Sequence, residues 1–301
     1  MRVRETGKIL DNLWLLGREE SCVYLLQGTR DSMIVSGGMS YIVPDVLQQF
    51  EEFGINEKRI TKLLILHSHF DHVGIIPFLK RRISGLTLYG SGRAWEILHM
   101  PKAIKTINAF SRTVASRVGR EEVYTTHDLE WGESIEGQTV SEGDIMDLGD
   151  LSGYIYETPG HSSCSISFYV PKIKALFVSD GAGIPYGETI LASGNSDFTK
   201  YQENLERLKD LDVKYICADH FGYITGEEAR NFIQKSINAA RDFRDLIEDV
   251  YRRTGDIDST VKILTDSFYR FNKGYFLAPE IMEGVNRQMV RHVVGTMGKS
   301  L

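Results

Sequence analysis

The spacing of apolar residues changes once along the chain, near residue 225. Up to about residue 225, short apolar runs bounded by glycine, aspartate or serine alternate with segments whose apolar residues recur every three or four positions. The short runs are typical of buried strands, and the longer spacing is typical of helices with one buried face. Strands are expected at residues 13–16, 22–26, 33–35, 62–66, 86–89, 154–158, 165–170, 175–178 and 215–217. Residues 1–225 are therefore predicted to form one mixed α/β (α+β) domain.

The helical segments indicate a second part of the chain. Within the first domain, helices are expected at residues 44–53, 75–83, 93–99, 102–118 and 198–208. After Gly226 the pattern becomes helical almost throughout, and the apolar residues from Phe232 to Val250 recur at three- and four-residue steps, as in one long amphipathic helix. Two more helices are expected at 257–269 and 279–295. We predict a helical extension over residues 226–301.

One short segment concentrates side chains that bind metal ions. In LLILHSHFDHVG, an apolar run leads directly into His67, His69, Asp71 and His72. Residues two positions apart in an extended segment project to the same face, so His67 and His69 can bind one ion together. Asp71 and His72 fall on the following turn, where they can hold a second ion. Two ions about 3.5 to 4 Å apart are a usual arrangement for hydrolytic chemistry.

Three further candidate ligands each follow a predicted strand. They are His161 in TPGHSS, Asp180 in FVSDG and His220 in DHFG. A carboxylate directly after an apolar strand is costly unless it meets a cation. Each of the three alone could be an ordinary turn residue. Together with the first segment they make seven nitrogen and oxygen ligands, enough for two cations.

These four motifs resemble, in order and spacing, the signature series of the metallo-β-lactamase superfamily, over about residues 8–225. The resemblance implies an αββα sandwich with the site at one edge of two facing sheets. It implies a first metal held by His67, His69 and His161, a second held by Asp71, His72 and His220, and Asp180 as the bridging carboxylate. Asp71 and Asp180 are then the catalytic carboxylates, and a metal-bridging hydroxide is the nucleophile. The ligand types favour Zn²⁺ as the two divalent ions, with Fe or Mn as alternatives.

The ligand set also narrows the branch of the family. Asp180 in the bridging position disfavours antibiotic hydrolysis, and His69 stands where the oxygen-reducing flavodiiron branch has glutamate. The chain most resembles the branch of glyoxalase II, and its length and helical tail are similar to those of the quinolone-signal-response thioesterases. The resemblance implies that residues 226–301 cover the active site. We expect hydrolysis of a small thioester or ester, with a phosphodiesterase, or a regulatory metal-binding protein acting through its tail, as alternatives.

Three positions near the expected site depart from the family pattern. Ile75 stands where the family often has a second glycine after His72, Asp219 stands where glycine is common, and Ser36 ends the third strand where an acidic residue is usual. None of these departures removes a ligand. Asp219 could orient His220 or shift its loop, and the sequence leaves both interpretations open.

Composition excludes several other classes of protein. The 301 residues include 35 Lys and Arg and 41 Asp and Glu, which gives a net charge of −6. A negatively charged chain does not attract a phosphate backbone, so the expected partner is a small-molecule substrate and not a nucleic acid. No apolar run approaches the roughly 18 residues of a membrane span, and the first residues lack a signal-peptide pattern. Cys22, Cys164 and Cys217 are far apart, without CxxC spacing, which favours a reducing cytoplasm. Nothing in the sequence specifies an oligomeric state.

Overall fold

The computed structural model describes residues 1–297, which form two compact units. The first unit consists of Met1–Glu157, Cys164–Ser179 and Asp212–Arg230. The second consists of Thr158–Ser163, Asp180–Leu211 and the residues from Asn231 onward. Both units are therefore discontinuous in sequence.

Two seven-stranded sheets form the first unit. One sheet runs in chain order through β2 (Gly7–Leu10), β3 (Leu13–Arg18), β4 (Ser21–Gln27), β5 (Ser32–Val35), β6 (Ile60–Leu64), β7 (Thr87–Ser91) and β8 (Gln138–Val140). The other has the order β1 (Arg2–Val3), β16 (Tyr223–Thr225), β15 (Tyr215–Cys217), β12 (Ala175–Phe177), β11 (Ile166–Val170), β10 (Ser152–Glu157) and β9 (Ile145–Asp147). In the first sheet β2 to β5 are antiparallel and β5 to β8 are parallel.

The apolar faces of the two sheets share one core. Leu15, Tyr24 and Val35 of the first sheet belong to the same buried cluster as Phe168 and Phe177 of the second. The rings of Tyr24 and Phe177 meet edge to face, with centroids 5.4 Å apart. Burial of these apolar side chains stabilises the fold, because each Å² of apolar surface removed from water contributes about 25 cal/mol of free energy.

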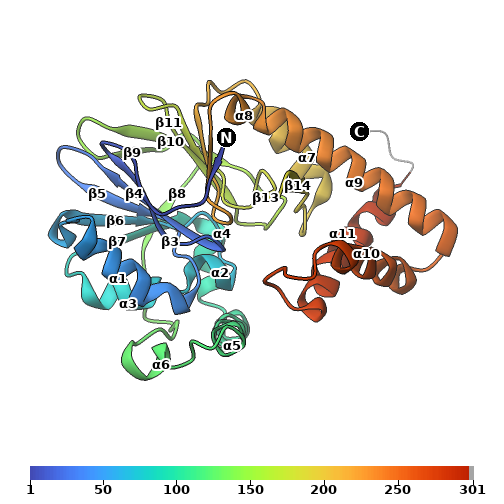
Figure 1. Ribbon diagram of the computed structural model, residues 1–301, viewed down its shortest axis with the longest axis horizontal. Helices are drawn as coiled ribbons and strands as arrows, with labels where there is room; N and C mark the ends of the chain where they lie inside the picture. The colour runs from blue at the N-terminus through green and yellow to red at the C-terminus, as the bar shows by residue number, and fades with distance from the viewer. Residues whose placement is uncertain (298–301) are drawn as a thin grey trace. The chain divides into compact units, whose positions relative to one another are not determined.

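The helices of the first unit include those between the strands of its first sheet, and α8 (Glu227–Arg230), which follows the last strand and packs against β15 and β16 of the second sheet. The others are α1 (Val43–Glu52), α2 (Phe70–Val73), α3 (Ile76–Arg82), α4 (Gly92–Leu98), α5 (Pro101–Arg117) and α6 (Val123–Thr126), with 3₁₀ turns at Ser40–Ile42 and Glu57–Arg59. Figure 1 shows α1 and α3 on the outer face of the sheet that contains β3 to β7. Pro44 stands in the first turn of α1, and Gly54 follows its end with a φ of 63°, as the sequence predicts.

The second unit consists of a short hairpin and four helices. Its elements are β13 (Ile184–Tyr186), β14 (Thr189–Leu191), α7 (Phe198–Leu208), α9 (Phe232–Thr254), α10 (Ile257–Phe271) and α11 (Pro279–Thr296). The long helix α9 packs against α7, α10, α11 and β14. It ends at Gly255, which has a φ of 64°, and Asp256 then begins α10 by accepting a hydrogen bond from the Ser259 amide.

The predicted architecture of two facing sheets with outer helices and C-terminal helices is confirmed. Every expected strand and helix is present, whereas the short strands β1, β2, β8, β9, β13, β14 and β16 and the one-turn helices α2, α6 and α8 were not predicted. Such elements have two to four residues, too few to show a hydrophobic period. The domain boundary at residue 225 and the cover over the active site stay predictions. Among residues 1–297, no helix is long and apolar enough to cross a membrane.

Candidate metal centre

The HSHFDH segment lies between β6 and α2. The strand ends at Leu64, two residues earlier than predicted, so His67 and His69 lie on the loop and not on the strand. Asp71 and His72 lie on α2, a single helical turn that starts after His69. The rings of His67 and His69 are nevertheless close, with centroids 4.6 Å apart.

A glycine-rich loop fixes α2 in place. The Gly37 amide donates to the His72 carbonyl at 2.8 Å, and the Gly74 amide donates to the Gly38 carbonyl at 2.7 Å. A Cβ atom at position 74 would lie 2.2 Å from the Ser40 nitrogen, far inside van der Waals contact. Glycine at position 74 therefore allows the close approach that positions Asp71 and His72.

His220 is held by the turn between β3 and β4. Its Nδ1 lies 2.7 Å from the Glu20 carbonyl oxygen. The backbone on either side of His220 is bonded to the same hairpin: the Cys22 amide of β4 donates to the Asp219 carbonyl at 2.7 Å, and the Phe221 amide donates to the Glu19 carbonyl at 2.6 Å. The imidazole of His220 therefore has a fixed orientation.

His161 is held in a comparable way within the second unit. Its Nδ1 lies 2.8 Å from the Ser193 carbonyl oxygen. Gly160, with a φ of 145°, lies so close to Tyr201 that a Cβ atom would meet the backbone nitrogen of that residue at 2.5 Å. The Ser193 hydroxyl donates to the carbonyl of Asp180 at 2.6 Å, so one serine supports both candidate ligands.

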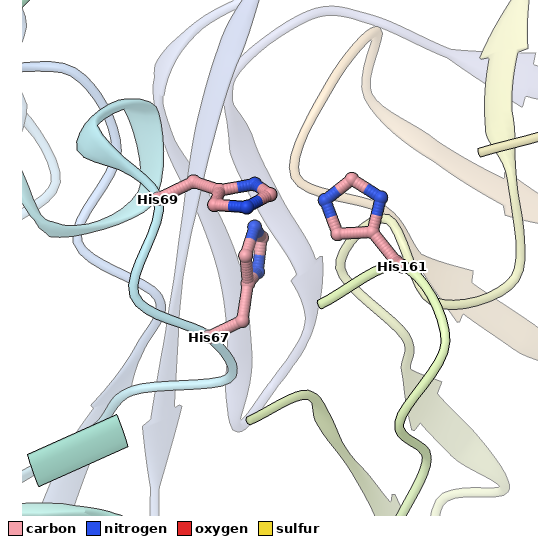
Figure 2. Close-up of side chains that lie close together, drawn as sticks. All are labelled: His67, His69 and His161. Atoms are coloured by element: carbon pink, nitrogen blue, oxygen red, sulfur yellow. The ribbon is translucent and has the colours of Figure 1, made fainter. Parts of the chain in front are cut away.

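The seven candidate ligands form three groups that share members. The groups are His67, His69 and His161; His67, His72 and Asp180; and Asp71, His72 and His220, and the ligand atoms within each lie within 4.8 Å of one another. Figure 2 shows the rings of the first group pointing toward one another. All seven side chains are buried except that of His69, which is half-buried.

The donor atoms suit divalent cations. Nε2 of His72 and Nε2 of His220 each lie 3.6 Å from Oδ2 of Asp71, and Nε2 of His161 lies 3.4 Å from Oδ2 of Asp180. These separations are long for hydrogen bonds. Two ligands of one tetrahedral Zn²⁺, each about 2.0 to 2.1 Å from the ion, are roughly 3.3 to 3.4 Å apart. The donor atoms of these residues therefore suit the divalent metal ions that they are expected to bind.

The outer nitrogens of four of these histidines meet protein groups. Nδ1 of His161 and Nδ1 of His220 face backbone carbonyls, whereas Nδ1 of His72 lies 2.8 Å from Oδ2 of Asp219 and Nδ1 of His67 lies 3.1 Å from the Ser179 hydroxyl. A partner on Nδ1 leaves Nε2 to face the centre, which is the usual state of a metal-binding histidine.

Asp219 contacts a different histidine from the one considered in the sequence. Its carboxylate meets His72, and His220 is oriented by the backbone of Glu20 instead. Sequence reasoning missed this contact and the roles of Ser179, Ser193 and Glu20. Ser179 precedes Asp180 in the FVSDG motif, which is a weak signal, but the backbone carbonyls of Ser193 and Glu20 leave no trace in the sequence.

The thiols do not contribute to the centre. Cys22, Cys164 and Cys217 are buried, and no cysteine belongs to a candidate metal group among residues 1–297. Burial raises the pKa of the Cys22 and Cys217 thiols, so they are protonated near neutral pH.

Comparison with known proteins agrees with this geometry. The sequence model of the metallo-beta-lactamase superfamily matches residues 16–220. The chain is 25% identical to the metallo-beta-lactamase fold-containing protein ST1585 of Sulfurisphaera tokodaii, over 69% of this chain and 75% of that protein. It is 27% identical to a hydroxyacylglutathione hydrolase of Methylobacterium nodulans, over 45% of this chain but only 38% of that enzyme.

Solved structures show the same fold. The metallo-beta-lactamase family protein TTHA1429 of Thermus thermophilus aligns with a TM-score of 0.69 and 15% identity, over 97% of this chain and 95% of that one. The subclass B3 metallo-beta-lactamase BJP-1 of Bradyrhizobium japonicum aligns with a TM-score of 0.58 and 17% identity, over 81% of this chain and 94% of that one. At these identities the likeness extends to the fold and not to the substrate.

Proposed function

Because the chain belongs to the metallo-beta-lactamase superfamily, we propose that it is a dinuclear metal-dependent hydrolase that cleaves a small thioester or ester. The observation that carries the proposal is the overlap of the three ligand groups. His67 belongs to the first two groups and His72 to the last two, so the ligands form one continuous set from His69 to His220. Such a set holds two neighbouring ions rather than one.

Each ligand then has a defined role. His67, His69 and His161 would hold the first ion, Asp71, His72 and His220 would hold the second, and Asp180, which groups with one ligand of each, would contribute its carboxylate between the two sets. Divalent ions supply positive charge beside the carbonyl oxygen of the substrate and an acidic water as nucleophile. The chain itself holds the imidazole rings in one orientation through their Nδ1 partners. Nitrogen and oxygen ligands without thiolate suit Zn²⁺ best, and Fe or Mn as alternatives.

The substrate class follows the hydroxyacylglutathione hydrolases, whose name describes the hydrolysis of a thioester. Several of them are 25 to 28% identical to this chain, over 40 to 54% of its length. Thioester hydrolysis adds one water to the acyl carbon, breaks the C–S bond, and releases a carboxylic acid and a thiol. This hydrolysis requires no oxidant and no co-substrate other than water.

Metal content and turnover on one sample test this proposal. Protein purified without added metal is analysed by inductively coupled plasma mass spectrometry and assayed with a generic thioester and with bis-p-nitrophenyl phosphate. We expect about two equivalents of metal and faster turnover of the thioester. The Asp180→Asn variant should lose at least about 100-fold in kcat, since a carboxylate at the reacting centre is removed. Asp128→Asn, which changes an exposed carboxylate, is the matched control.

Other outcomes would overturn parts of the proposal. Preference for the phosphodiester, with inhibition by inorganic phosphate, would make the enzyme a phosphodiesterase with the same centre. Protein that binds no divalent ion and turns over neither substrate, even after reconstitution, would exclude the hydrolase and favour a regulatory protein.

A further inference from the structure

A buried carboxylate gathers three hydrogen bonds beneath the candidate centre. Oδ2 of Asp219 accepts from the Ser36 hydroxyl at 2.8 Å and from the Ser179 hydroxyl at 2.5 Å, and Nδ1 of His72 lies 2.8 Å away. The side chain of Asp219 is 1% exposed. Two of the three departures from the family pattern, Ser36 and Asp219, are thus bonded to each other across 183 positions of sequence.

The two serines adopt a backbone conformation that serine rarely takes. Ser36 has a φ of 68° and Ser179 a φ of 47°, both in the left-handed region. Ser36 directly follows β5, and Ser179 lies two residues after the end of β12, so each sheet has one such residue just beyond a strand. Strained residues persist where the surrounding structure requires them, often at functional sites. Here both turns aim a hydroxyl at the same oxygen of Asp219.

The hydrogen bonds also determine the protonation of two histidines. A serine hydroxyl has one proton, and that of Ser179 is donated to Asp219. Toward Nδ1 of His67, 3.1 Å away, the Ser179 oxygen can therefore only accept, so this nitrogen carries the proton. Nδ1 of His72 must carry a proton for the same reason, since it faces both the carboxylate and the Ser179 oxygen. In both rings the lone pair is then on Nε2.

We propose that Asp219 is the positioning residue of the centre, which fixes His72 directly and His67 through Ser179. This inference rests on the metal-binding role proposed above. His67 and His72 belong to different ions in that proposal, so one buried carboxylate sets the ring orientation and tautomer of one ligand of each ion. The effect on the second ion is the larger, because His72 bonds Asp219 itself.

Metal titration of matched variants tests the proposal. Asp219→Ser should weaken binding of the second equivalent of Zn²⁺ by about 10- to 100-fold, the usual cost of losing such a partner, and weaken the first less. Asp219→Asn keeps the shape of the side chain and removes its charge, and it should weaken the second equivalent as well. Asp128→Asn, which changes an exposed carboxylate outside this network, is the control and should bind both equivalents as the wild type does.

An exchange of the two side chains tests the position of the charge. The double variant Ser36→Asp/Asp219→Ser moves the carboxylate from position 219 to position 36, its hydrogen-bond partner, and we expect it to reach Nδ1 of His72 from there. Aspartate also tolerates the left-handed conformation of position 36 better than serine does. We expect this double variant to recover the binding of the second equivalent. A folded double variant that binds as weakly as Asp219→Ser would contradict the proposal.

Side-chain ¹⁵N NMR of the histidines gives a readout that needs neither metal nor activity. In metal-free full-length protein at constant pH, we expect His67 and His72 as Nδ1–H tautomers, and a shift of His72 toward the Nε2–H form in Asp219→Ser. Unchanged tautomers together with unchanged metal affinity in both Asp219 variants would overturn the proposal. If the wild-type protein binds no metal but Asp219→Ser still shifts the tautomer of His72, the proposed function is contradicted and the positioning of His72 by Asp219 is supported.

Discussion

Nδ1 of His220 lies 2.7 Å from the carbonyl oxygen of Glu20, 200 positions earlier in the chain. The contact joins the loop after β15 to the turn between β3 and β4, which belong to different sheets. The amide of Gly222 also donates to Sγ of Cys22 at 3.2 Å. A ligand loop of one sheet is thus held by a hairpin of the other.

Tyr24 strengthens this link from within the core. Its hydroxyl is fully buried and lies 2.7 Å from the Ala218 carbonyl oxygen and 3.1 Å from that of Gly222. In Tyr24→Phe both carbonyls lose this donor, so we expect the free energy of unfolding to fall by about 1 to 3 kcal/mol. Urea denaturation measures the change. Tyr154→Phe, at a position 40% exposed, should stay within about 0.5 kcal/mol of wild type, and equal losses in the two variants would contradict the prediction.

Gly74→Ala tests the placement of α2. The new methyl group would lie 2.2 Å from the Ser40 nitrogen and 2.6 Å from the Met39 carbonyl carbon, neither of which is a flexible side chain. We expect a loss of stability of about 1 to 3 kcal/mol and a weaker second metal site, because α2 carries Asp71 and His72. Thermal unfolding and metal titration measure the two effects.

The control for this variant is Gly92→Ala. Its new methyl group would meet only Thr139 Cγ2 at 3.5 Å, an ordinary contact. A Gly74→Ala protein as stable as the control and with the same metal content would show that the loop of Gly37 and Gly38 does not fix α2.

The sequence predicted best what depends on neighbours in the chain. The hydrophobic periods of α7 and α9 are local, and so is the His-rich HSHFDH segment, so these elements and candidate ligands could be found without a structure. The superfamily resemblance was confirmed over residues 16–220. The contact between Ser36 and Asp219 could not be predicted, because it depends on how two sheets pack. A single sequence marks both residues as unusual but does not show that they touch.

Strand ends were predicted less well than strand centres. The apolar run of β6 continues through Ile65 and Leu66, yet the strand ends at Leu64. Both of these later residues are buried outside the strand, so apolar character marks burial here and not the strand itself. Likewise β8 and β9 belong to different sheets, although only Ser141–Asp144 separates them, and no local signal marks that crossing.

Removal of metal should lower the thermal stability of the protein. Asp71, Asp180 and Asp219 are buried carboxylates, and cations bound beside them stabilise the folded state only. Each ion present at about 100 times its Kd contributes about 2.7 kcal/mol, which for a chain of this size corresponds to a Tm lower by roughly 4 °C for each ion that chelation removes. Differential scanning calorimetry with and without EDTA measures the shift. Asp180→Asn should show a smaller shift, and an unchanged wild-type Tm after complete metal loss would contradict the proposed centre.

Asp31 makes stability depend on pH at the junction of β5 and β6. A hydrogen bond from Lys62, at 2.5 Å, lowers the pKa of the Asp31 carboxyl to about 2, and Thr61 donates a second bond at 2.9 Å. The folded pKa is below the unfolded value of about 3.9, so the stabilisation is present above pH 4 and is lost as the pH falls toward 2.

Asp31→Asn should therefore be less stable than wild type by about 0.5 to 1 kcal/mol at pH 7, since solvent screens the ion pair. The difference should narrow at pH 3, because the unfolded wild-type carboxyl is then largely protonated and the native ion pair no longer gives its full advantage. Urea denaturation of both proteins at pH 7, 4 and 3 measures the difference, and comparison at equal pH cancels any loss of metal that the two share. Asp210→Asn, which changes an exposed carboxylate, should show no such trend. A difference between Asp31→Asn and wild type that is as large at pH 3 as at pH 7 would mean that shape, and not the charge of Asp31, stabilises this junction.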